Sequence, residues 1–301
     1  NRAKKSIVHY HFCFGFFSLM NEINTYKPKQ FFILTFAVTW ACWFAAPYFG
    51  DPINSDLIFL VLMLVGLFTP FITALYLIFK SKNGALKRIF FNKLLNIKLI
   101  KWSTIPLFLI LFPASIIISV LISTLFGYSF DQFTIADEFS FSVGGIPTLL
   151  VLLLAACFEE LGWRGYAVES LNKKFNYFEA TAIFGVLWSL WHLPMFFIPE
   201  SYQAELLQED FILVINFFVS IIPLAFIISW FCKKNSGSIL GAILIHSIVN
   251  LSQEFFLVSP YTKCIQTLIL IVIAAIFIIV DRNVFFGDAE KVNIERIKHF
   301  S

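Results

Sequence analysis

The chain of 301 residues is too hydrophobic for a water-soluble domain, since 59% of its residues are hydrophobic and only 14% are charged, against roughly a quarter in soluble domains. Its apolar runs reach the ~20 residues that cross a bilayer as a helix, and it lacks the ~10-residue alternating segments of a β-barrel. We therefore expect an all-α polytopic membrane bundle surrounded by lipids, with no nucleic acid as a partner.

The predicted elements begin with a cytoplasmic segment, 1–30, in which residues 1–19 would be either an extension upstream of the first methionine, Met20, or a short interfacial segment. An eight-helix membrane domain is expected over 31–280, followed by a cytoplasmic tail, 281–301. The expected transmembrane helices are 31–49, 56–79, 103–127, 142–168, 178–198, 211–232, 237–257 and 264–280.

The stretch between the second and third predicted helices, 80–102, interleaves lysine and arginine with leucine, isoleucine and phenylalanine. Such a pattern is typical of an amphipathic helix on the inner leaflet, and a plain basic loop is the alternative. The acidic connections, around 50–55, 128–141, 199–210 and 258–263, are expected to be loops.

Lysine and arginine are concentrated in every second connection between the predicted helices. Of the 22 basic residues, all except Lys263 lie in 1–30, 80–101, 164–174, 233–234 or the tail. This bias predicts that both the N- and C-termini are cytoplasmic. The abundance of phenylalanine, isoleucine, lysine and asparagine indicates an AT-rich coding sequence, so we expect a multi-pass protein of a bacterial plasma membrane.

Polar side chains occur inside three of the predicted helices. An ionisable group at membrane depth costs at least ~2.5–3.5 kcal/mol, so such groups tend to face the bundle interior and serve a function. The fourth helix carries Glu159, Glu160 and Arg164, the fifth His192, and the seventh His246, Asn250 and Glu254. Glu254 is expected to be an interfacial charge near the outer end, and the many tryptophans and phenylalanines are expected to face lipid.

Glu159, His192 and His246 lie at similar predicted depths, ~18–21 Å of helix from the cytoplasmic ends at ~1.5 Å per residue. They are therefore expected to converge on one site with a wet path to the cytoplasm. The spacing of Glu160 and Arg164 predicts an ion pair across one helical turn. His246 and Asn250 should likewise share a helix face.

Pro194, two residues after His192, should kink the fifth helix because proline cannot donate to the helical ladder. The five cysteines include no CxxC pair and therefore indicate neither a disulfide framework nor a thiolate metal site.

Three short motifs carry a family resemblance: E-E-x-x-x-R at 159–164, aromatic-x-x-x-H at 188–192 and H-x-x-x-N at 246–250. In this order they resemble the motifs of the CAAX protease and bacteriocin-processing family. These are intramembrane glutamate proteases that include the type II CAAX prenyl endopeptidases. The likeness covers roughly 145–255, the predicted motif core, and Trp188 stands where the family more often has phenylalanine.

The resemblance implies an intramembrane endopeptidase that needs no cofactor. The catalytic group would be Glu159, Glu160, His192, His246 and Asn250, supported by Arg164 and Trp188. A glutamate and a histidine, Glu159 and His192, would activate water. His246 and Asn250 would cradle the oxyanion. Glu160 is expected to position Arg164 rather than to act as a second base. The expected substrate is a peptide or protein that approaches from the cytoplasmic side.

Three other functions stay open. Two histidines and a glutamate match the ligand set of many catalytic zinc sites, although no HExxH motif is present. The chain could also be a non-catalytic relative, such as a bacteriocin immunity factor or a regulatory partner, in which the Glu160–Arg164 pair is a structural bridge. A transporter is less favoured, because inverted repeats are not seen.

Overall fold

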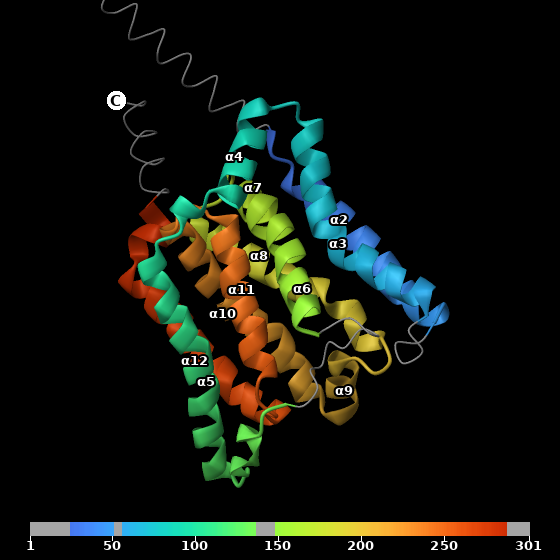
Figure 1. Cartoon of the computed structure of the whole chain (residues 1–301), viewed down its shortest axis with the longest axis vertical. Coiled ribbons are helices and arrows are strands. Elements are labelled where there is room, and N and C mark those ends of the chain that lie inside the picture. The colour runs from blue at the N-terminus through green and yellow to red at the C-terminus, as the bar shows by residue number, and fades with distance from the viewer. Residues whose placement is uncertain (1–24, 51–55, 137–147, 288–301) are drawn as a thin grey trace, which may run out of the picture.

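The computed structural model describes residues 25–50, 56–136 and 148–287 (Figure 1). Within these ranges the chain is a bundle of helices, and one β-bridge joins Ile135 to Phe256. The all-α prediction is confirmed. The predicted extension 1–19, the loop residues 51–55, the start of the fourth predicted helix and most of the C-terminal tail lie outside the described residues.

Six segments are long and apolar enough to cross a membrane, and they correspond to six of the eight predicted helices. They contain α2 (Pro28–Ala45), α3 (Leu57–Lys80), α5 (Ile105–Ser123), α8 (Tyr177–Trp191), α10 (Phe211–Lys234) and α12 (Pro260–Val280). The other two predictions correspond to shorter elements. The seventh is α11 (Ile239–Glu254), and the fourth is α6 (Thr148–Gly162), continued by a π-helix (Trp163–Ala167) and α7 (Val168–Asn172).

The helix expected in the basic stretch is present as α4 (Gly84–Leu95). The Asn83 side chain caps it by accepting from the backbone N–H groups of Ala85 and Leu86, as asparagine does at helix N-termini. Leu86 and Phe90 are buried on its inner face. Its placement on the inner leaflet stays a prediction.

Two local predictions are wrong. Helix α8 ends at Trp191 instead of continuing with a kink, and the chain passes through His192 into a 3₁₀ turn, Leu193–Phe197. Proline in a helix both lacks the N–H and clashes with the carbonyl of the preceding turn, and here the chain ends the helix. The expected loop 199–210 contains α9 (Tyr202–Glu209), which starts where the Ser201 hydroxyl accepts from Ala204 N–H.

The prediction that tryptophans face lipid is wrong for four of them. Trp43, Trp163, Trp188 and Trp191 are buried in the bundle. Buried indoles need a partner for their N–H group, and Trp43 donates to the Met63 carbonyl at 3.0 Å. Tryptophan therefore belongs to the polar interior of this protein as well as to its surface.

Helices α3 and α6 touch at one level and separate at another. A Cβ atom on Gly162 would lie 2.5 Å from the backbone carbon of Pro70, so only glycine allows this contact between the two helices. Figure 1 shows α3 and α6 diverging from there towards the end of the molecule where α9 lies.

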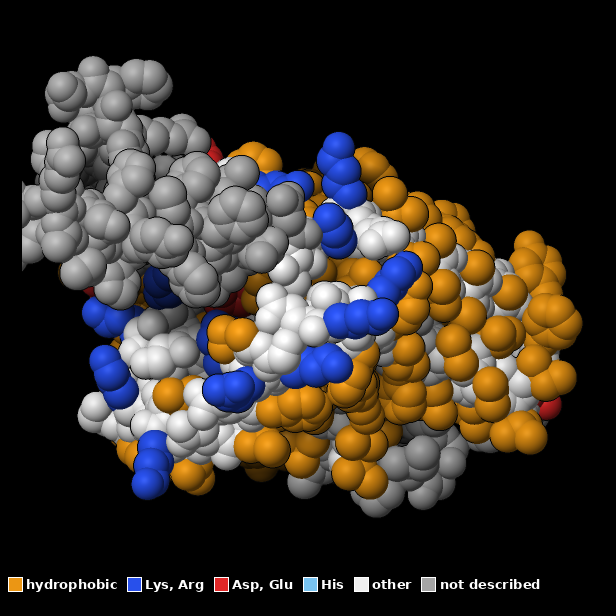
Figure 2. Space-filling view, turned by 90° about the horizontal axis from the view of Figure 1, so that it is seen from above, with side chains coloured by type: hydrophobic (Ala, Val, Ile, Leu, Met, Phe, Trp, Pro, Cys, Tyr) orange, Lys and Arg blue, Asp and Glu red, His pale blue; other side chains and the backbone are white. Residues whose placement is uncertain are grey.

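Charge is distributed unevenly between the two ends of the bundle. Figure 2 looks onto the end that carries α4 and shows lysine and arginine side chains gathered there, beside a flank that is almost entirely hydrophobic. Exposed members include Lys82, Arg88 and Lys98. The positive-inside rule predicts that this end faces the cytoplasm.

Candidate active site

A cavity of about 370 Å³ lies inside the bundle and is lined by α3, α6, α8, α10, α11 and α12. Most of its wall is apolar. Five of the predicted site residues line it together: Glu159, Trp188, His192, His246 and Asn250. The structure thus brings side chains from three distant stretches of sequence to one space, as the depth argument required. Glu160 and Arg164 do not line the cavity.

The cavity extends from these side chains towards α9. Its lining reaches Glu200, Glu254 and Lys263 and includes no residue of the basic stretches 80–101 or 233–234. This direction is opposite to the expected wet path, which led to the basic end. Glu254, at the end of α11, is also part of the cavity wall, and its position at the membrane interface stays a prediction.

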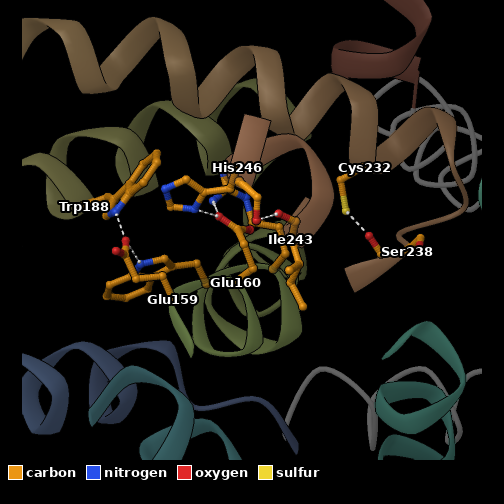
Figure 3. A network of polar contacts seen from close by, with 10 residues as sticks. Glu159, Glu160, Trp188, Cys232, Ser238, Ile243 and His246 are labelled. Carbon is orange, nitrogen blue, oxygen red and sulfur yellow. Dashed lines mark hydrogen bonds and ion pairs between the residues drawn. The ribbon is translucent and has the colours of Figure 1, made fainter. Parts of the chain in front are cut away.

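Glu159 is held by two indole groups. Its Oε2 accepts from Nε1 of Trp188 at 2.8 Å and from Nε1 of Trp163 at 3.3 Å (Figure 3). The side chain is 7% exposed, and its Oε1 makes no hydrogen bond to any of the described residues. Donors aimed at one oxygen fix the carboxylate and leave the other oxygen for a ligand in the cavity.

Replacing Trp188 by phenylalanine should separate the packing of its aromatic ring from its hydrogen bond to Glu159. Phenylalanine keeps an aromatic ring at this place but removes the shorter of the two hydrogen bonds to Glu159. A hydrogen bond to a charged group is worth ~1.5–3 kcal/mol, so we expect a loss in kcat of about tenfold to a hundredfold with KM nearly unchanged. An unchanged kcat would contradict this positioning role.

His192 is oriented by the end of α8. Its Nδ1 lies 2.9 Å from the backbone carbonyl of Trp188. Because a carbonyl only accepts, Nδ1 carries the proton in this contact, and a neutral ring then has its lone pair on Nε2. His192 lines the cavity together with Glu159 and His246.

His246 is oriented by the buried Glu160–Arg164 ion pair, whose residues do not line the cavity. Its Nδ1 lies 2.9 Å from Oε1 of Glu160, which also accepts from Nη1 of Arg164 at 2.6 Å. Figure 3 shows Glu160 directed towards His246 and Glu159 directed towards Trp188, so the two adjacent carboxylates point to different partners. The predicted ion pair within one helical turn is confirmed.

Trp188 is the common neighbour of these groups. Its ring centroid lies 5.4 Å from that of His246 and 6.3 Å from that of His192. The guanidinium of Arg164 lies over the same ring at 5.1 Å. The indole thus bonds to Glu159 through its N–H group, while its ring is a neighbour of the Arg164 guanidinium and of both imidazoles.

Sequence reasoning missed Trp163 and the irregular turn that begins with it. The signal for Trp163 was available, since it lies four residues after Glu159 and such pairs share a helix face. The π-helix carries Arg164, and Gly165 within it packs against Phe90 of α4, where a Cβ would lie 2.6 Å from the ring. π-turns of this kind occur frequently at functional sites.

Whether the site could hold a metal ion depends on which potential ligand side chains lie close together. Among the described residues, no group of three or more histidine, cysteine, aspartate or glutamate side chains is placed to hold a metal ion. The two imidazoles and the carboxylates are instead engaged with indole, carbonyl and guanidinium groups.

Comparison with known proteins agrees with the site. Residues 142–252 match the family described as "Type II CAAX prenyl endopeptidase Rce1-like". Over 261 residues the chain is 46% identical to the CAAX prenyl protease 2 of Methanococcus maripaludis, and the alignment covers 87% of this chain and 96% of the relative. That relative is archaeal, so a bacterial source for this chain stays a prediction. The chain is a multi-pass membrane protein, and it belongs to the type II CAAX prenyl endopeptidase family of intramembrane proteases.

Proposed function

We propose that the protein is an endopeptidase in which Glu159 and His192 activate a water molecule and His246 and Asn250 stabilise the oxyanion. The shared cavity is the observation that carries this proposal, because all four side chains line it although they come from three helices. The oxygen of the water would attack the peptide carbonyl carbon. Its proton would pass to the Glu159 carboxylate and then to the departing amine.

The activation of water relies on two open acceptors. Oε1 of Glu159 is the carboxylate oxygen not bonded to an indole. Nε2 of His192 is the ring nitrogen not engaged with a backbone carbonyl. A general base of this kind typically contributes 10²–10⁴-fold to the rate.

The oxyanion would be stabilised by Asn250 and His246. The amide N–H group of Asn250 is a neutral donor on the cavity wall. In its imidazolium form, His246 can donate from Nε2 into the cavity while Nδ1 donates to Glu160. One preorganised donor to an oxyanion is worth ~2.7–4 kcal/mol. Glu160 and Arg164 act in this proposal as positioning residues, with Glu160 oriented to His246 as well as to Arg164.

The substrate would be a prenylated CAAX-type tail, the class that the relative's name gives. The apolar wall suits a lipid chain, and Leu64 of α3 lines the cavity and is 40% exposed. A lipid-linked substrate could therefore reach the cavity between α3 and α6. The cavity extends away from the basic end. With that end cytoplasmic, a substrate from the cytoplasmic side would therefore enter sideways from the membrane, between α3 and α6.

The test is cleavage of a synthetic farnesylated CAAX peptide by the purified protein in phosphatidylcholine vesicles, followed by mass spectrometry of the products. We expect cleavage by the wild type and losses of at least a hundredfold for His192→Ala and Asn250→Ala. The mechanism uses no metal ion, so activity should survive chelator treatment and elemental analysis should find less than stoichiometric zinc. Zinc that tracks activity would instead favour the metal mechanism.

A further inference from the structure

Lys263 departs from the charge pattern of the chain. It is the one basic residue outside the segments predicted to be cytoplasmic. It lies in the first turn of α12, and it lines the cavity together with Pro260, Thr267 and Leu270. These positions recur every three or four residues, so one face of α12 forms this part of the wall. A lysine has thus been placed in a largely apolar cavity.

The Lys263 ammonium has no anionic partner in contact among the described residues. The ammonium lies over the ring of Tyr202, with 4.6 Å from Nζ to the ring centroid. Burial, reinforced by the nearby Glu254 charge, raises the pKa of the Tyr202 hydroxyl, so this ring stays neutral. Glu254 acts on Lys263 through its field, but no hydrogen bond or ion pair of the Lys263 ammonium is formed within the described ranges.

The distance from the catalytic group to Lys263 corresponds to a short peptide. His246 and Glu254 are eight residues apart on α11, which is ~12 Å of helix at ~1.5 Å per residue. Five residues, 255–259, connect the end of α11 at Glu254 to the start of α12 at Pro260, so Lys263 lies at the same end of the cavity as Glu254. An extended peptide spans ~3.3–3.6 Å per residue, so ~12 Å holds three to four residues. A CAAX tail has three residues after its cysteine.

We propose that Lys263 binds the free C-terminal carboxylate of the substrate and thereby fixes the distance between that carboxylate and the bond that is cleaved. This inference rests on the proposed function, which places the scissile bond beside Glu159 and His246. The N-terminal turn of α12 has no side-chain cap, and its partial positive charge favours an anion at the same place. The enzyme would then select peptides whose C-terminus lies at a fixed distance from the scissile bond, because the Lys263 ammonium binds the terminal carboxylate.

The experiment compares two farnesylated peptides of identical sequence, one ending in a carboxylate and one in a carboxamide, in phosphatidylcholine vesicles. We expect the wild type to cleave the carboxylate peptide about tenfold to a hundredfold faster in kcat/KM, the value of a hydrogen bond between charged groups. Lys263→Met should reduce this ratio to about one by slowing cleavage of the carboxylate peptide. Lys263→Arg, which keeps the charge, should retain most of the preference.

A matched control is Lys98→Met, which removes an exposed lysine at the opposite end of the bundle and should leave the ratio unchanged. A length series with two to six residues after the farnesylated cysteine should peak at three or four, and Lys263→Met should flatten that peak. Equal cleavage of acid and amide by the wild type, or an undiminished ratio in Lys263→Met, would overturn the assignment.

Binding to the Glu159→Gln variant separates this inference from the proposed function. If that variant binds the carboxylate peptide more tightly than the carboxamide, and the additional Lys263→Met change removes the difference, the carboxylate site is supported even if the wild type proves inactive. If the wild type cleaves peptides but binding shows no such difference, the carboxylate site is wrong and the protease proposal stands.

Discussion

Replacing Glu159 by glutamine should reduce peptide cleavage at least a hundredfold while the protein remains folded. Glutamine has nearly the same shape and can still accept the indole hydrogen bonds of Trp188 and Trp163 through its amide oxygen. It cannot take a proton from water, and the loss of a general base typically costs 10²–10⁴-fold. The measurement is the initial rate of cleavage of a farnesylated peptide in vesicles, with the melting temperature as the check on folding.

The control for this prediction is Glu209→Gln, an exposed glutamate at the end of α9, which should retain wild-type activity. Activity of Glu159→Gln above a tenth of the wild-type rate would remove Glu159 from the mechanism. If a cellular phenotype of the protein persists in Glu159→Gln, the phenotype does not need catalysis, and the non-catalytic hypothesis for this family member gains support.

Replacing Glu160 by alanine should cause the largest loss of stability among single substitutions in the site. The change leaves Arg164, which is 2% exposed, without its counter-charge, and removes the partner of His246. Arg164 has no reserve partners, because its Nε and Nη2 are buried without hydrogen bonds to the described residues. Removing one member of a buried pair typically costs ~3–5 kcal/mol, which thermal or denaturant unfolding in detergent would measure.

The matched control is Glu169→Ala, which breaks the more exposed pair between Glu169 and Lys93, where the side chains are 25% and 19% exposed and 3.0 Å apart. Pairs near the surface contribute ~0–1 kcal/mol. The double variant Glu160→Leu/Arg164→Met should recover much of the stability, since neither charge is then buried alone. Similar losses of stability for Glu160→Ala and Glu169→Ala would show that the burial of the ion pair does not determine the free energy lost when it is broken.

The parts of the site that could be predicted are those that follow from helix geometry. Glu160 with Arg164, and His246 with Asn250, are four residues apart, and that spacing alone fixes their common face. The similar depth of Glu159, His192 and His246 followed from a count of residues along straight helices. These arguments need no knowledge of how the helices pack against one another.

The parts that could not be predicted depend on packing. Sequence spacing does not say which helix faces which, so the contact of Glu160 with His246 and the bonding of Trp188 to Glu159 required coordinates. The same holds for the direction of the cavity, which placed Glu254 and Lys263 in its wall. The helix in 199–210 was missed because its own residues are mostly polar, and hydropathy does not indicate a short polar helix.

The π-helix after α6 also sets how the end of this segment is rotated. A π-turn holds one residue more than a regular turn, and in an α-helix one residue corresponds to about 100° of rotation. Removing a single residue from 163–167 could restore regular winding, but every side chain beyond it would then face about a quarter-turn away. Tyr166, whose hydroxyl accepts from the backbone of Lys27, and the whole of α7 would lose their present neighbours. The additional residue of the π-turn therefore sets the rotation between α6 and α7. With this rotation, α6 directs its side chains to the catalytic group, and the residues after the turn keep their packing contacts.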